Sequence, residues 1–295
     1  MPYSQQISRE NPNLFLFLLD QSYSMTEEFG QPDKDGNAQT KANALAEAVN
    51  ATISEVILRC TRGEGVREYF EIGILGYGPQ GECRFAWEGG LVGQTVASLP
   101  EIKLHAAIQK YKQETVVRGR IVEEELQEET WVRPVADGGT PMKAALERAK
   151  IVVSDWIANH RSSYPPMVIN ITDGMATDVM DERELVQVAN EIKNLETEDG
   201  NALLINCHIT SHKKAAVYFP GAPEELPDDN YAKTLYEMSS VLPPQMNAIV
   251  AEMFSKSTVG AAGLRGLAYN AGPVQLIKFL DIGTRQALDN MSPTS

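Results

Sequence analysis

Oxygen-bearing side chains follow a long apolar run near the N-terminus. Residues 14–19 are all leucine or phenylalanine, and Asp20, Ser22 and Ser24 follow at alternate positions. An apolar run of this kind is typical of a strand that is buried on both faces of a parallel sheet. Ligands in such folds bind at the carboxyl ends of the strands. Because all three side chains offer oxygen, the pattern predicts a site for a hard cation such as Mg²⁺ rather than for zinc.

Two further segments contain oxygen ligands that fit the same site. Thr140 lies in an Asp-Gly-Gly-Thr-Pro string, and Asp173 ends a second apolar run just before Gly174. Each segment also has an ordinary structural explanation, since Thr140 before Pro141 suits a helix N-cap and Asp-Gly suits a turn. Taken together, the side chains predict one Mg²⁺ or Mn²⁺ site formed by Asp20, Ser22, Ser24, Thr140 and Asp173.

These five residues, in this order along the chain, resemble the metal-ion-dependent adhesion site of von Willebrand factor type A (vWA) domains, and they fill all five motif positions. The resemblance covers about residues 12–240. It implies a Rossmann-like fold and a cation whose coordination is completed by an Asp or Glu of a partner protein. The chain is most similar in setting to stand-alone bacterial intracellular members, such as those of the tellurite-resistance type, which are associated with kinase and phosphatase partners.

The elements that must position these residues alternate along the chain. Apolar residues at steps of three and four predict helices over 42–60, 141–156, 185–195 and 231–238. Apolar runs predict strands over 69–77, 167–172 and 202–209, with 82–87 as the hairpin partner of the strand at 69–77. This alternation predicts an α/β fold, with a doubly wound, mostly parallel central sheet, one antiparallel edge strand and helices on both faces.

Two regions exceed a minimal domain of this type. We expect residues 88–136 to form an insertion with a helix-like stretch at 104–112, ending near the metal site because it runs into Thr140. Its acidic run, 123–129, is interpreted as a solvated helix face or loop in preference to a docking surface. Residues 241–295 are predicted to be an extension packed on or beside the domain, with a helix at 245–254, small residues at 260–266, and a helix or strand at 274–280.

Composition excludes some classes of function. A formal net charge of −14 disfavours non-specific nucleic-acid binding, because the phosphate backbone would be repelled. The first residues lack the basic segment and apolar core of a signal peptide, and residues 14–19 are too few to span a bilayer. We therefore expect a cytoplasmic protein with no membrane contact. The three cysteines, Cys60, Cys83 and Cys207, are interpreted as buried thiols in a reducing compartment.

Catalytic interpretations have weaker support. Gly76, Gly78 and Gly81 have the spacing of a dinucleotide-binding fingerprint, but Pro79 and the hairpin that follows leave no helix N-terminus for a pyrophosphate. Cys207, His208 and His212 could suggest zinc, but no second ligand pair accompanies them. No G-x-S-x-G or H-E-x-x-H motif is present.

The predicted function is therefore a non-enzymatic one. We expect a metal-dependent protein-interaction module, acting as a regulatory or scaffold subunit. The alternative is a metal-dependent phosphohydrolase that uses Asp20 as its nucleophile, because an apolar strand ending in Asp resembles the nucleophile strand of haloacid dehalogenase-type phosphatases. Those enzymes need a second acid two residues further on, where this chain has Ser22.

Overall fold

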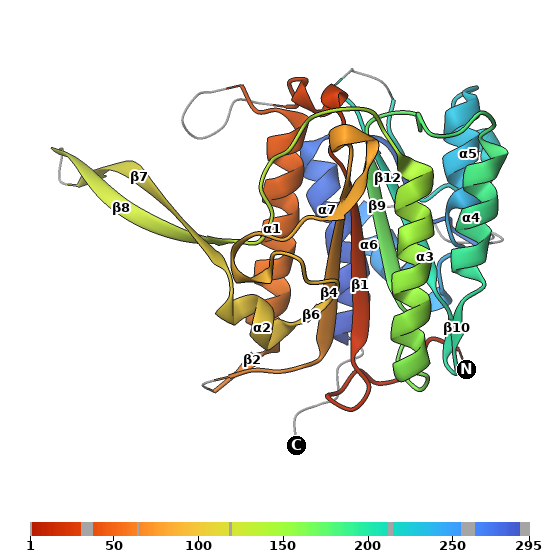
Figure 1. Ribbon diagram of the computed structural model, residues 1–295, viewed down its shortest axis with the longest axis horizontal. Helices are drawn as coiled ribbons and strands as arrows, with labels where there is room; N and C mark the ends of the chain where they lie inside the picture. The colour runs from red at the N-terminus through yellow and green to blue at the C-terminus, as the bar shows by residue number, and fades with distance from the viewer. Residues whose placement is uncertain are drawn as a thin grey trace.

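A central sheet of eight strands organises the molecule (Figure 1). The computed structural model describes residues 2–30, 38–63, 65–117, 120–211, 215–254 and 263–289, without the side chains of 111–125 and 282–289. The spatial order of the strands is β13 (Val217–Tyr218), β14 (Leu267–Ala271), β12 (Leu203–Ile209), β9 (Met167–Thr172), β1 (Asn13–Asp20), β4 (Phe70–Tyr77) and β5 (Cys83–Phe85), and β6 (Ala97–Ser98) also pairs with β4.

The inner strands are parallel and the edges are antiparallel. β14, β12, β9, β1 and β4 pair in parallel, which confirms the predicted α/β class with a mostly parallel sheet. The sequence predicted one antiparallel edge strand, whereas the described part of the structure has three. β5 and β6 are antiparallel to β4 at one edge, and β13 is antiparallel to β14 at the other. β13 and β6 have two residues each, which is too short to give a recognisable alternation in the sequence.

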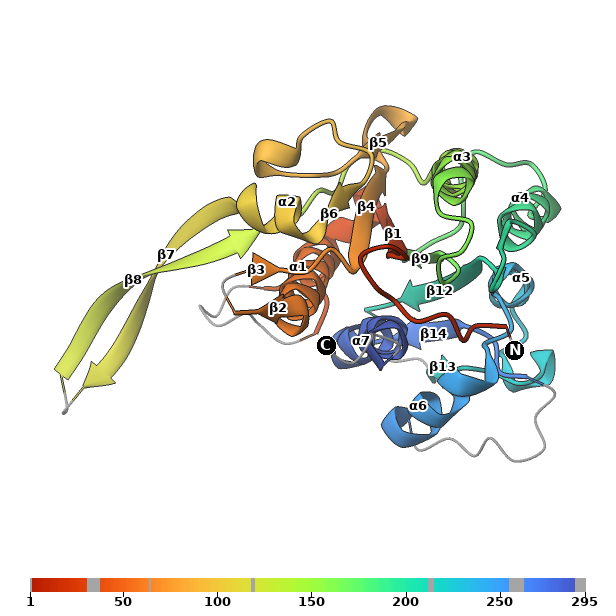
Figure 2. The ribbon, with the colours of Figure 1, turned by 90° about the horizontal axis from the view of Figure 1, so that it is seen from below.

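Helices cover both faces of the sheet (Figure 2). One core contains residues of α1 (Lys41–Cys60), α6 (Pro244–Phe254) and α7 (Pro273–Asp289), and the other contains residues of α3 (Met142–Asn159), α4 (Arg183–Lys193) and α5 (Asn230–Met238). β1 contributes to both, because Phe15 and Phe17 pack in the first core and Leu16 and Leu18 in the second. This period of two explains why β1 is apolar at every position from Leu14 to Leu19.

The insertion differs from the prediction. Residues 104–112 do not form a helix. A short helix, α2 (Leu99–Leu104), is followed by an antiparallel hairpin of β7 (Ala107–Val117) and β8 (Arg120–Thr130). The acidic run at 123–129 therefore lies on a strand, since pairing with β7 satisfies the backbone of both segments; the side chains of 123–125 are outside the described residues. The hairpin projects beyond α1, away from the rest of the molecule (Figures 1 and 2).

The segment after residue 240 contributes a strand to the central sheet. β14 lies inside the central sheet, between β12 and β13, and all five of its residues are buried. Without β14, the buried strand β12 would be left as an open edge, so the predicted boundary at 240 does not coincide with an edge of the fold. The helix predicted at 245–254 is confirmed as α6, and residues 274–280 belong to a helix, α7. Residues 260–262 are outside the described part.

The remaining elements are short. They are η1 (Tyr23–Thr26), β2 (Thr61–Arg62), β3 (Gly65–Val66), η2 (Pro79–Gly81), η3 (Gly89–Leu91), β10 (Glu196–Thr197), β11 (Gly200–Asn201) and η4 (Pro223–Glu225). Cys60 and Cys207 are buried, and Cys83 is half-buried. Among the described helices, none has the length and apolar character needed to cross a bilayer.

Candidate metal site

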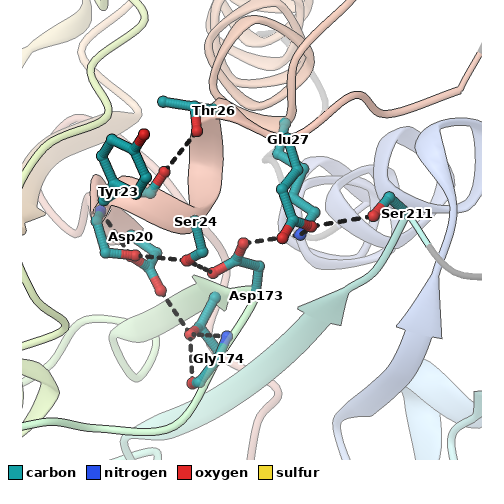
Figure 3. Close-up of polar contacts among 11 residues, drawn as sticks. Asp20, Tyr23, Ser24, Thr26, Glu27, Asp173, Gly174 and Ser211 are labelled. Carbon is teal, nitrogen blue, oxygen red and sulfur yellow. Dashed lines mark hydrogen bonds and ion pairs between the residues drawn. The ribbon is translucent and has the colours of Figure 1, made fainter.

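Asp20 lies at the carboxyl end of β1 and is completely buried (Figure 3). Its Oδ1 accepts a hydrogen bond from the backbone N–H of Ser22 at 2.9 Å, and its Oδ2 accepts one from the hydroxyl of Thr172 at 2.7 Å. Burial raises the pKa of Asp20 to about 6, and hydrogen bonds from Ser22 and Thr172 oppose this shift while the nearby charge of Asp173 adds to it. Asp20 therefore holds a proton more readily than an exposed carboxylate does.

A chain of hydroxyl groups joins the end of β1 to the end of β9. The hydroxyl of Ser24, on η1, donates to Asp173 Oδ1 at 2.7 Å, and the hydroxyl oxygens of Ser22 and Ser24 are 3.0 Å apart. Because the single O–H of Ser24 is directed to Asp173, a hydrogen bond between the two serines would have Ser22 as its donor. Asp20, Ser22, Ser24 and Asp173 are thus brought together, as Figure 3 shows for the three of them that it labels.

Thr140 reaches the same edge of the sheet on a separate loop. The backbone N–H of Asp137 donates to Gln21 O at 2.7 Å, and that of Tyr23 donates to Gly138 O at 3.0 Å. Gly138 has φ +74°, and a Cβ atom there would lie 2.3 Å from Gly78 O, so this close approach requires glycine. Thr140 is buried, but no described hydrogen bond joins its hydroxyl to the other four predicted ligands.

The predicted N-cap role of Thr140 is not found. α3 begins at Met142, and the backbone N–H groups of Lys143 and Ala144 donate to the carboxylate of Asp178 at 3.2 and 2.9 Å. Thr177, the neighbour of Asp178, exchanges two hydrogen bonds with Thr140: its hydroxyl accepts from the backbone N–H, and its own N–H donates to the carbonyl. The loop after β9 therefore holds both Thr140 and the start of α3. Because Asp178 caps α3, the side chain of Thr140 is not needed as its N-cap.

Lys41 is a residue of the site that the sequence analysis missed. Its side chain is only 5% exposed, and Nζ donates to Asp173 Oδ2 at 2.9 Å and to Glu27 Oε2 at 2.6 Å. Burial lowers the pKa of Lys41, but its bonds to the two carboxylates outweigh burial and leave the pKa raised. A signal was present in the sequence, because Lys41 precedes Leu45, Val49 and Ile53 at steps of four and so belongs to the buried face of α1.

Aromatic side chains lie against the loop that carries Asp173. The hydroxyl of Tyr231 donates to Gly174 O. His208, at the end of β12, stacks on Tyr269 with ring centroids 4.5 Å apart, and burial lowers its pKa to about 4. His208 is therefore neutral near pH 7, and its Nδ1 accepts a hydrogen bond from Asn270 N at 3.3 Å. His212, the other histidine considered for zinc, lies outside the described residues.

The donor set fits a hard divalent cation. It consists of two carboxylates and three hydroxyls, which are oxygen ligands of the type that Mg²⁺ and Mn²⁺ accept. Nowhere in the described part of the chain do three or more His, Cys, Asp or Glu side chains gather as a metal-binding group. A site built here would therefore rely on hydroxyl groups, and one of its two carboxylates is already neutralised by Lys41.

Comparisons with known proteins give only distant similarities. No protein-family model and no curated protein matches the chain. Among solved structures, the vWF domain of the type V pili tip protein Mfa5 from Porphyromonas gingivalis is 10% identical, with a TM-score of 0.42 and 97% of this chain and 98% of that chain covered. The PilB minor pilin from Streptococcus sanguinis is 10% identical, with a TM-score of 0.43 and coverage of 95% and 62%.

A third similar structure contains the three N-terminal domains of Mfa5. It is 12% identical, with a TM-score of 0.27, and the match covers 56% of this chain and 20% of that chain. This chain therefore spans about one fifth of that three-domain structure. At such low identities and TM-scores, these likenesses assign neither a function nor a metal to the chain.

Proposed function

We propose that this chain is a metal-dependent protein-interaction module that binds an acidic residue of a partner protein through Mg²⁺ or Mn²⁺. The observation that supports the proposal most strongly is the hydrogen-bonded group of Asp20, Ser22, Ser24 and Asp173 at the carboxyl ends of β1 and β9. These residues come from segments about 150 positions apart in the chain, since the bond from Ser24 to Asp173 has a sequence separation of 149.

The charge of the site favours binding of an anionic partner group. Asp20 and Asp173 are its only carboxylates among the five predicted ligands, and Asp173 already accepts a hydrogen bond on each oxygen, from Ser24 and from Lys41. A divalent cation held by so few negative ligands stays electrophilic and attracts another anionic oxygen. An Asp or Glu side chain of a partner protein supplies that oxygen.

The chemistry supports a regulatory or scaffold subunit better than an enzyme. A phosphohydrolase with Asp20 as nucleophile would need an acid two residues further on, and Ser22 stands at that position. The resemblance to the intracellular bacterial vWA proteins adds the expectation of a cytoplasmic location and of kinase or phosphatase partners.

Calorimetry with Mg²⁺ and Mn²⁺ tests the metal site. We expect one cation per chain for the wild type, none for Asp20→Ala, and unchanged binding for Asp155→Ala, a matched control on the exposed face of α3. Equal binding by the wild type and Asp20→Ala would disprove the site. A pull-down with and without EDTA tests the interface, and a partner retained at full affinity in EDTA and by Asp173→Ala would show that the cation is not at the interface.

A further inference from the structure

A buried ammonium group lies at the edge of the candidate metal site. Lys41 opens α1, its side chain is 5% exposed, and that of Asp173 is fully buried. Glu27, whose side chain is 50% exposed, accepts from Lys41 at 2.6 Å and from the hydroxyl of Ser211 at 3.1 Å. Figure 3 shows Asp173, Glu27 and Ser211 in one connected row. Lys41 thus links a predicted metal ligand to a half-exposed carboxylate at the surface.

The position of Lys41 is costly for folding alone. A positive charge in the first turn of a helix is disfavoured by the helix dipole, and α1 has no acidic residue there to compensate. Burying an ammonium group also costs free energy, and Lys41 needs both of its carboxylate partners to offset that cost. An apolar side chain would fill the same place on the buried face, next to Leu45 in the i, i+4 row. The charge therefore points to a role in the site.

The charges of the site show what that role is. The buried charges of the site, those of Asp20, Asp173 and Lys41, sum to −1. The carboxylate of Glu27 also contacts Lys41, but it is half-exposed and solvent screens its charge. A divalent cation would change this sum to +1, whereas without Lys41 the loaded site would be neutral. A fixed ammonium group beside the site repels a cation and attracts a carboxylate.

We propose that Lys41 is a specificity-determining residue of the metal site, which weakens the binding of the divalent cation and strengthens the binding of a carboxylate to the loaded site. This inference rests on the proposed function. Lys41 thereby restricts the site to partners that present an anionic oxygen, because the loaded site keeps an excess positive charge. Glu27 acts in the opposite sense, since its negative charge partly cancels that of Lys41.

Two affinities measured on the same variants test the inference. Mn²⁺ binding is followed by the electron paramagnetic resonance signal of the free ion. Carboxylate binding is followed by titrating acetate into the Mn²⁺-loaded protein and measuring water-proton relaxation, which falls as acetate replaces a coordinated water. For Lys41→Met we expect roughly tenfold tighter Mn²⁺ binding together with roughly threefold or more weaker acetate binding. For Glu27→Gln we expect the reverse of both changes, of smaller size because Glu27 is half-exposed.

The matched control is Lys150→Met, which removes the same charge from an ion pair with Glu191 more than two turns into α3. We expect this variant to leave both affinities unchanged, since it lies outside the site. If Lys150→Met reproduced the changes of Lys41→Met, the effect would belong to net charge and the inference would be wrong.

A purely structural role for Lys41 predicts a different outcome. Lys41→Met would then misplace Asp173 and weaken both Mn²⁺ and acetate binding. This result would overturn the inference about Lys41 without contradicting the proposed metal site. A wild-type protein that binds no Mn²⁺ would instead overturn the proposed function, and the inference with it. If Lys41→Met does not fold, the Glu27→Gln variant tests the inference instead. Affinities for Mn²⁺ and acetate that change in the same direction, or that do not change, would contradict the inference.

Discussion

The carboxylate of Asp20 shows how one residue can link metal binding to pH. Its full burial at the end of β1 raises its pKa to about 6, against a usual value of 3.8. A cation that binds Asp20 must displace the proton that the carboxylate holds below this pKa. In the proposed site, protons and cations therefore compete for the same oxygens in a range just below neutral pH.

Cation affinity should consequently fall as the pH decreases through about 6. We expect Mn²⁺ to bind roughly tenfold more weakly near pH 5 than near pH 7.5, because at the lower pH about nine in ten Asp20 side chains are protonated. Calorimetry at the two pH values measures the ratio. Titrations near pH 6 in buffers of different ionisation enthalpy should show proton release on binding, and the absence of both effects would contradict this role of Asp20.

His208 should give the free energy of unfolding a pH dependence of its own. Burial lowers its pKa from 6.5 to about 4, so between these values the unfolded chain binds more protons than the folded one, and stability falls as the pH drops through this window. The full shift corresponds to about 3 kcal/mol at most. Asp20 acts in the opposite direction, so the difference between wild type and His208→Phe isolates the contribution. Urea unfolding near pH 7.5 and pH 4.5 measures it, and a pH-independent difference would contradict it.

At the scale of elements, the loop after β9 joins the proposed metal site to α3. Thr177 holds the backbone of Thr140, and Asp178 accepts from the first N–H groups of α3. The two tasks that the sequence suggested for Thr140 are thus divided between different residues. The same loop carries Asp173 and Gly174, so β9, α3 and the Thr140 loop are positioned by one segment.

This division predicts opposite effects for two substitutions. Asp178→Ala should lower the free energy of unfolding by about 1 kcal/mol through loss of the cap, with little change in Mn²⁺ affinity. Thr140→Ala should weaken Mn²⁺ and partner binding with nearly unchanged circular dichroism and stability, because its hydroxyl makes no cap bond. Urea unfolding and calorimetry on both variants check the pair. A stability loss in Thr140→Ala as large as that in Asp178→Ala would contradict it.

At the scale of the whole molecule, the core does not depend on the site. β1 is buried along its entire length, and helices from both faces pack against the sheet. The hydrogen bonds of Asp20 with Ser22 and Thr172 join protein groups directly. The fold should therefore persist when metal is removed.

Removal of the cation should accordingly have a small effect on stability. With Mn²⁺ at about ten times its Kd, binding adds about 1.4 kcal/mol, which corresponds to a Tm shift of about 2 °C for a protein of this size. Thermal unfolding with Mn²⁺ and with EDTA, together with far-ultraviolet circular dichroism, measures the difference. Loss of the native spectrum in EDTA would show instead that the cation holds the fold together.

The α/β class and the proximity of Asp20, Ser22, Ser24 and Asp173 could be predicted from the sequence because their causes are local. An apolar run that ends in Asp20 or Asp173 marks a buried parallel strand and its carboxyl end, and neighbouring parallel strands place those ends together. The helices α1, α3, α4, α5 and α6 were predicted for the same reason, since an apolar stripe repeats within each segment.

Only the tertiary structure decided where distant segments meet. Lys41 looks like an ordinary first residue of a helix until α1 packs beside β9 and its Nζ contacts Asp173, 132 positions away. Asp178 becomes a helix cap only because the loop after β9 lies against the start of α3. β14 enters the sheet because β12 would otherwise expose its edge, and the acidic run lies on a strand because β7 pairs with it. These outcomes depend on long-range partners, and local periodicity does not identify such partners, even where it places Lys41 on the buried face of α1.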